Sequence, residues 1–141
     1  MRGLIGGSDV GDREAVILDM EASLEHMRRG TVRHVDTMLV VTEPYFRSLE
    51  TAGRLADLGR EFGLLRIVAV ANKVRTSDEE QAIRDYCDRH SIEVGALIPF
   101  DPAVTGADNA GLALLDVAPH SEAVRQIQAL ALSLDRAKEV V

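Results

Sequence analysis

Ala15-Val16-Ile17-Leu18-Asp19-Met20-Glu21-Ala22 is an apolar run that ends in an acidic pair. The run predicts a buried strand over residues 15–19 that presents Asp19 and Glu21 at its carboxyl end. Ligands of open α/β sheets sit just outside the carboxyl ends of the strands. The stretch therefore predicts a parallel sheet with an acidic rim.

Two further apolar runs also end in polar residues. The run Ile67 to Ala71 is followed by Asn72-Lys73-Val74, and another closes with Ile98-Pro99-Phe100-Asp101. The sequence pattern predicts strands over 37–41, 66–71 and 94–98, which alternate with helices over 47–62, 77–90 and 121–137. Proline and glycine residues break 101–120 into a loop with short helical pieces. We expect Gly63 to end the first of these helices and Ser77 to cap the second. The alternation is typical of βαβ units and predicts an α/β fold with a mostly parallel sheet.

Composition agrees with one α/β domain over residues 1–141, although 1–13 are weakly patterned. Apolar residues make up 46% of the 141 residues and aromatic residues only 4%, as expected for aliphatic parallel strands covered by helices. The net charge of −7 disfavours a nucleic-acid-binding surface. A single cysteine, Cys87, excludes an internal disulfide or a cysteine-rich metal site. The sequence shows neither a signal peptide nor an apolar run long enough to span a membrane, so we expect a cytoplasmic location.

Residues 17–31 resemble the second acidic motif of the MinD/ParA-like P-loop ATPases. The similarity is greatest to the branch of carbon monoxide dehydrogenase accessory (CooC-like) proteins, which reads Asp-Met-Glu-Ala-Gly-x-Glu-His and then Arg-Gly-Thr. The resemblance covers roughly residues 14–134 and continues, in the same order, through Val40-Val41-Thr42-Glu43-Pro44, Ser48-Leu49-Glu50-Thr51-Ala52, Val70-Ala71-Asn72-Lys73-Val74, Gly95-Ala96-Leu97-Ile98-Pro99-Phe100-Asp101, Ala107-Asp108, Gly111 and Asp116. It implies a P-loop NTPase-like (Rossmann-like) three-layer fold.

The resemblance also implies roles for the rim residues. Asp19 would help to hold Mg²⁺, Glu21 would lie where the terminal phosphate of ATP is sensed, and the two would be the catalytic residues. Asn72 and Lys73 correspond to the pair that reads the purine base of ATP or ADP, and the other wall of that pocket corresponds to Pro99, Phe100 and Asp101. The simpler alternative for Asp19 and Glu21 is that a solvent-exposed strand end carries acids. For Asn72 and Lys73, and for Pro99, Phe100 and Asp101, it is that they are ordinary turn residues.

The sequence departs from the family at several positions. The phosphate-loop motif G-x-x-x-x-G-K-[ST] is not found in these 141 residues, Ser23 stands where the family has glycine, and the Cys-x-Cys element of CooC-like proteins is missing. The four histidines lack the spacing of metal ligands. Because the loop supplies most of the affinity for phosphate, we expect weak nucleotide binding and no ATP hydrolysis from this chain alone.

Three hypotheses follow. The first is a CooC-like ATPase fragment that in intact relatives would serve nickel insertion into carbon monoxide dehydrogenase or a related metalloenzyme. The second is a non-catalytic protein-interaction module, and the third is a half-domain that complements a separate phosphate-loop chain. A sheet without its phosphate-loop strand has an open edge, which predicts a homo-oligomer.

Overall fold

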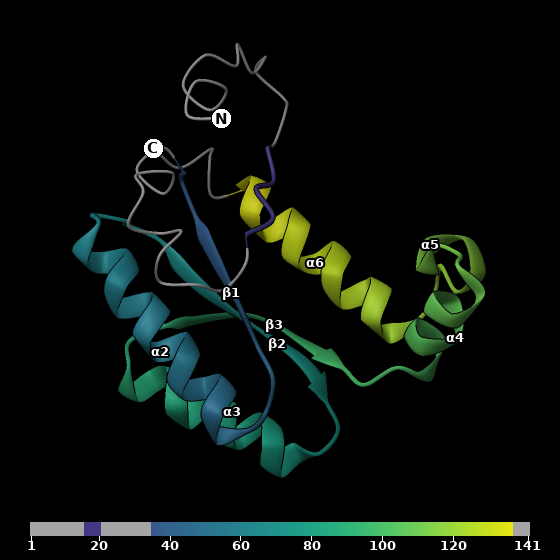
Figure 1. Ribbon diagram of the computed structural model, residues 1–141, viewed down its shortest axis with the longest axis horizontal. Helices are drawn as coiled ribbons and strands as arrows, with labels where there is room; N and C mark the ends of the chain where they lie inside the picture. The colour runs from purple at the N-terminus through teal and green to yellow at the C-terminus, as the bar shows by residue number, and fades with distance from the viewer. Residues whose placement is uncertain (1–15, 21–34, 137–141) are drawn as a thin grey trace.

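The computed structural model describes residues 16–20 and 35–136 and contains a three-stranded parallel sheet. Strands β1 (Met38–Thr42), β2 (Ile67–Val74) and β3 (Glu93–Pro99) lie in the order β1-β2-β3 (Figure 1). Met38 is opposite Ile67 in the first pair, and Val68 is opposite Glu93 in the second. Because neighbouring strands are parallel, each connection must cross back over the sheet, and a helix does so each time.

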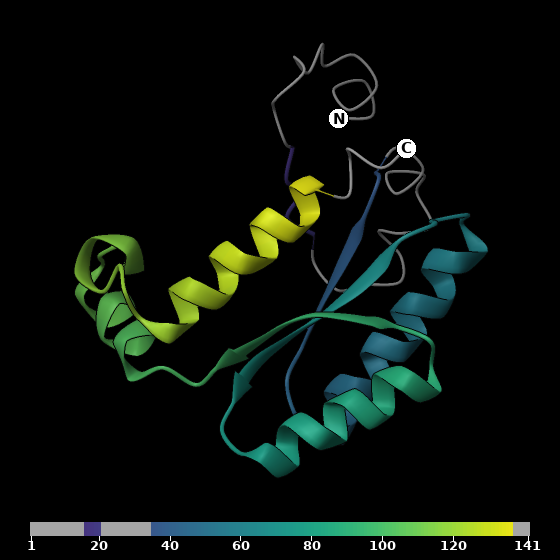
Figure 2. The same ribbon diagram turned by 180° about the vertical axis from the view of Figure 1, so that it is seen from behind.

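Helices cover both faces of the sheet. Helix α2 (Phe46–Glu61) and helix α3 (Ser77–Arg89) lie on one face, where Val40, Ala56, Ala69 and Ile83 share a buried core. Helix α6 (Glu122–Arg136) packs on the opposite face through Leu130, against Val70 and Ala96 (Figures 1 and 2). The result is the predicted three-layer arrangement, and the α/β class is confirmed.

The ends of the helices follow local sequence signals. Helix α2 stops before Gly63, which has a φ of +84° that side chains other than glycine disfavour. Helix α3 is capped by Thr76, whose hydroxyl accepts a hydrogen bond from the Glu79 N–H, so the predicted cap at Ser77 is wrong by one residue. The predicted broken segment contains two short helices, α4 (Pro102–Ala110) and α5 (Leu114–Val117).

The predicted strand over 15–19 is not formed. Residues 16–20 have no regular secondary structure, Ile17 is 89% exposed, and both Ala15 and Glu21 lie outside the described residues. A strand is stable only when a neighbour satisfies its backbone hydrogen bonds, and in the described part of the chain no strand pairs with this segment. The apolar run is therefore exposed here instead of buried.

Strand β1 forms an edge of the described sheet. It pairs only with β2 among residues 35–136. Val40 and Thr42 are buried beneath α2, whereas the alternate residues Leu39 and Val41 are exposed, Val41 by 63%. Side chains alternate between the faces of a strand, so this apolar pair lies on the face of the sheet where α6 covers β3 but not β1.

Candidate functional site

The carboxyl ends of β1 and β2 are joined by an ion pair. Lys73 Nζ lies 2.9 Å from Glu43 Oε1, and the Glu43 side chain is the more buried partner. Glu43 is also fixed through its backbone, because its N–H donates to Ser48 Oγ at 2.9 Å. Ser48 Oγ in turn lies 3.0 Å from the hydroxyl of Thr42, the one fully buried polar side chain among the described residues. The loop after β1 therefore holds a carboxylate in place next to Lys73.

The end of β2 is distorted at Asn72 and Lys73. The register with β3 shifts between Ala71 and Val74, and Lys73 adopts a φ of +59°. The Lys73 N–H donates to Asn72 Oδ1 at 3.0 Å, so Nδ2 is the donor end of the Asn72 amide. Left-handed backbone costs a residue with a side chain about 1–2 kcal/mol, and such strain is concentrated at functional sites.

The end of β3 lies against this bulge. The Phe100 N–H donates to the Val74 carbonyl at 2.8 Å, which extends the pairing of Val74 with Pro99. The exposed Phe100 ring carries the Arg75 guanidinium, with Cζ 4.0 Å from the ring centroid. A planar ligand would meet this stacked pair, because both an aromatic ring and a guanidinium offer a flat face.

Asp101 has a structural role at the start of α4. Its carboxylate accepts a hydrogen bond from the Ala103 N–H at 2.9 Å and caps α4. The side chain is therefore fixed beside Phe100 by the start of the next helix.

The structure does not bring Asp19 to this rim. Its side chain is exposed, and segment 16–20 lies toward the opposite end of the strands from their carboxyl ends (Figures 1 and 2). Glu21 lies outside the described residues. Residues 16–20 and 35–136 contain no group of three histidine, cysteine or acidic side chains that could hold a metal ion. The predicted roles of Asp19 in binding Mg²⁺, and of Asp19 and Glu21 in catalysis, stay predictions.

Comparison with known proteins identifies relatives of the chain. The carbon monoxide dehydrogenase accessory protein CooC of Rhodospirillum rubrum is 41% identical over 107 residues, which are 76% of this chain and 40% of CooC. The solved ParA family ATPase of Chlorobium tepidum matches with a TM-score of 0.57 and 28% identity, over 73% of this chain and 42% of that one. The chain belongs to the MinD/ParA-like family of P-loop ATPases, close to CooC.

A third relative shows the same fold with a nucleotide bound. MinD of Pyrococcus horikoshii, solved in complex with Mg-ADP, matches with a TM-score of 0.61 and 21% identity, over 73% of this chain and 42% of that one. No protein-family model matches the chain. This MinD/ParA-like chain thus spans about two fifths of the length of these relatives.

Most of the predicted rim residues of this MinD/ParA-like chain lie at the carboxyl ends of two neighbouring strands, β2 and β3. They are Asn72, Lys73, Pro99, Phe100 and Asp101. Reasoning from the sequence alone missed Glu43 and Arg75. The signal for Glu43 was its place directly after the strand preceding β2, because an acid there faces Lys73 when consecutive strands are neighbours. Arg75 had no comparable signal, since its contact with Phe100 depends on the direction of the chain after the bulge.

Proposed function

We propose that this chain supplies the base-binding half of a CooC-like ATPase, with ATP or ADP as the ligand. The observation that carries the proposal is the meeting of β2 and β3 at the Phe100–Val74 hydrogen bond, which places the Asn72 and Lys73 backbone beside the Phe100–Arg75 pair. Asn72 Nδ2 offers donors to the acceptor atoms of a purine edge, and the flat pair offers a stacking surface.

The described residues fit the base of a nucleotide better than its phosphates. Phosphates are bound by converging backbone N–H groups with a lysine, and the one lysine at the described rim, Lys73, is paired with Glu43. We propose that a strand and phosphate loop dock along the open edge of β1, either from elsewhere in the same polypeptide or from a separate one. Residues 15–19 would then gain the neighbour that they need to form a strand, and Asp19 and Glu21 would reach Mg²⁺.

Nucleotide titration tests this proposal. We expect this chain alone to bind ADP weakly, and to bind it with micromolar affinity when mixed with a polypeptide that carries a MinD/ParA-like phosphate loop. Asn72→Ala should weaken that binding by about tenfold, the cost of a lost hydrogen bond to a ligand. Asn109→Ala, an exposed asparagine of α4, is the matched control and should leave the affinity unchanged. Equal affinities for the two variants would refute the base-binding role.

The completed assembly would act in maturation of a metalloenzyme, with ATP hydrolysis coupled to nickel delivery. The support is the name of the R. rubrum relative, a carbon monoxide dehydrogenase accessory protein. Activation of apo carbon monoxide dehydrogenase by nickel, with and without the assembly, tests this step. If the mixture binds no nucleotide, the chain is instead an interaction module that kept the sheet as a scaffold.

A further inference from the structure

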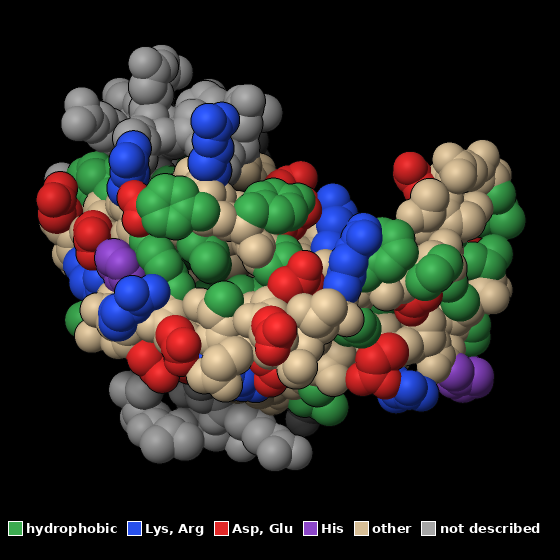
Figure 3. Space-filling view, turned by 90° about the horizontal axis from the view of Figure 1, so that it is seen from below, with side chains coloured by type: hydrophobic (Ala, Val, Ile, Leu, Met, Phe, Trp, Pro, Cys, Tyr) green, Lys and Arg blue, Asp and Glu red, His purple; other side chains and the backbone are tan. Residues whose placement is uncertain are grey.

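One face of the Phe100 ring is covered by a guanidinium. Arg75 follows the end of β2, Phe100 follows the end of β3, and Arg75 Cζ lies 4.0 Å from the centroid of the ring. Figure 3 views the molecule from the carboxyl ends of the strands and shows lysine and arginine side chains beside hydrophobic ones on this side. Stacked bases lie about 3.4 Å apart, so a base between the ring and the guanidinium would need about twice that spacing. A base that stacks on this face of the ring must therefore displace Arg75.

The ring is the one partner that the structure gives to the Arg75 guanidinium within residues 16–20 and 35–136. Three acids at this end of the molecule have other partners. Glu79 accepts a hydrogen bond from the backbone N–H of Arg75, Glu43 pairs with Lys73, and Asp101 caps α4. The Arg75 side chain is exposed, and an exposed contact between a cation and a ring is worth about a two- to fivefold change in an equilibrium constant.

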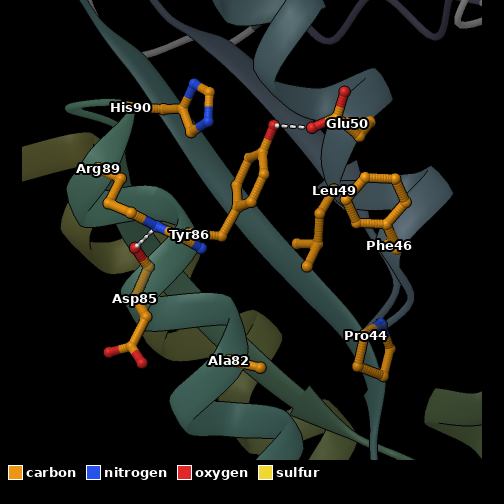
Figure 4. A pocket seen from close by; sticks show the side chains of 9 residues that line it. All are labelled: Pro44, Phe46, Leu49, Glu50, Ala82, Asp85, Tyr86, Arg89 and His90. Atoms are coloured by element: carbon orange, nitrogen blue, oxygen red, sulfur yellow. Dashed lines mark hydrogen bonds between the residues drawn. The ribbon is translucent and has the colours of Figure 1, made fainter.

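Arg89 shows how an arginine is held when it belongs to the scaffold. It lines the groove between α2 and α3, where its Nε donates to the Asp85 carbonyl at 3.0 Å (Figure 4). Its Cζ lies 5.9 Å from the centroid of the buried Tyr86 ring. Arg75 has the closer contact with a ring, on an exposed side chain, and lacks such a hydrogen bond among the described residues. Arg75 can therefore leave its ring at the loss of one weak contact.

The backbone on both sides of the contact is fixed. The Arg75 N–H donates to Glu79 Oε2 at 2.6 Å, and the Phe100 N–H donates to the Val74 carbonyl at 2.8 Å. Exposed side chains change rotamer within picoseconds to nanoseconds. The guanidinium can thus swing away without a change in the fold, while the ring stays in place as a flat surface.

We propose that Arg75 is a lid on the base site, and that its guanidinium and the base of ADP or ATP compete for one face of Phe100. This inference rests on the base-binding function proposed above and adds its regulation. Stacking of a base on an aromatic ring is worth about 5- to 150-fold in affinity, more than the contact that Arg75 loses. The base therefore displaces the lid. A base on the outer face of the guanidinium would instead rest on a mobile side chain, whose ordering lowers the affinity.

Adenosine tests the lid on the full chain alone. It carries the base and has no phosphate that the charge of Arg75 could attract, and an NMR titration gives its dissociation constant. We expect Arg75→Ala to bind adenosine about two- to fivefold more tightly than the parent chain. Arg89→Ala removes the other arginine beside a ring. It is the matched control and should bind adenosine like the parent chain.

A variant of the ring shows whether the gain acts through Phe100. In a Phe100→Leu chain, Arg75→Ala should bring no gain in affinity, because the two groups no longer compete for a ring. A gain that persists there would overturn the lid. Unchanged binding by Arg75→Ala would also overturn it, as would weaker binding, which would place the base on the guanidinium.

Asn72→Ala separates this inference from the proposed function. If Asn72→Ala and the parent chain bind adenosine equally, the role of Asn72 in reading the base is refuted. The lid still stands in that case if Arg75→Ala binds more tightly than the parent chain. Absence of binding by the parent chain and by Arg75→Ala alike would overturn both, because removal of the lid should reveal the ring.

Discussion

At the scale of single residues, Lys73 carries two opposed contributions to stability. Its ion pair with Glu43 is favourable and its φ of +59° is unfavourable. An exposed ion pair contributes about 0.2–1 kcal/mol, whereas left-handed backbone costs about 1–2 kcal/mol. The backbone strain outweighs the ion pair, so the conformation reflects what the bulge at the end of β2 imposes.

Substitution of Lys73 separates the two contributions. We expect Lys73→Gly to change the free energy of unfolding by less than about 0.5 kcal/mol, because relief of strain is offset by loss of the ion pair together with the larger conformational entropy that glycine loses on folding. Lys73→Val loses the same ion pair and adds a β-branched side chain at positive φ, so it should cost about 1–2 kcal/mol. Urea denaturation measures both values, and equal losses would show that the bulge imposes no strain.

Cys87 provides a pH-dependent prediction. Burial, followed by the nearby charge of Asp88, raises the pKa of the Cys87 thiol above its usual 9.0. Burial, followed by the charge of Glu50, likewise raises the pKa of Tyr86. Groups whose pKa is raised on folding stabilise the folded state below the unfolded pKa and lose that contribution as pH rises.

We therefore expect the melting temperature to decline as pH rises above 9, and native Cys87 to react slowly with a thiol reagent until the chain unfolds. Cys87→Ala should move the start of this decline in melting temperature toward pH 10, because Tyr86 is then the remaining one of these two groups whose raised pKa makes stability depend on pH. A melting temperature that stays level up to pH 11 would contradict the assignment.

At the scale of elements, two glycines make a matched test of packing. A Cβ on Gly95 of β3 would overlap Val68 and lie 3.1 Å from Leu130 Cδ1, whereas a Cβ on Gly106 of α4 would meet no atom within 4 Å. Gly95→Ala should therefore cost about 1–3 kcal/mol through overpacking between the sheet and α6. Gly106→Ala should stabilise the protein by about 0.5–1 kcal/mol, because alanine is the better helix former. Chemical denaturation of the two variants should give opposite signs, and destabilisation by both would contradict the packing described here.

The elements also show where prediction from sequence succeeds and fails. The runs at 15–19 and 66–71 are both aliphatic, yet only the second forms a strand, because β1 and β3 lie on either side of it. A single run does not reveal whether a neighbour is present. Likewise Thr76 and Ser77 are both good caps, and the choice between them depends on the extended backbone of Thr76. Asn72 and Phe100 could be predicted at the rim because strand ends mark it, whereas the groove at Tyr86 depends on how two helices lie side by side.

At the scale of the whole molecule, the edge at β1 bears on assembly. Open strand edges beside exposed apolar side chains recruit further strands. We expect a homodimer or larger assembly at about tens of micromolar protein, with the β1 edge and Val41 at the interface. Val41→Lys should shift sedimentation toward the monomer, since charged edge residues oppose pairing. Glu61→Lys, which adds a lysine away from β1, is the control, and a strictly monomeric parent chain would refute the prediction.

No helix among residues 16–20 and 35–136 has the length and hydrophobicity needed to cross a membrane.

The order of the strands across the sheet is also the order in which a ribosome makes them. Each new strand can dock on the one before it during synthesis, since domains fold from the N-terminal side as they emerge. The face that α6 covers is different, because of the described elements α6 is made last. Residues 100–136 take roughly two to seven seconds at about 5–20 residues per second. Until α6 is made, Val70 and Ala96 lack the cover that Leu130 gives them. We therefore expect this face of the nascent chain to be open to chaperone binding and to aggregation during that interval.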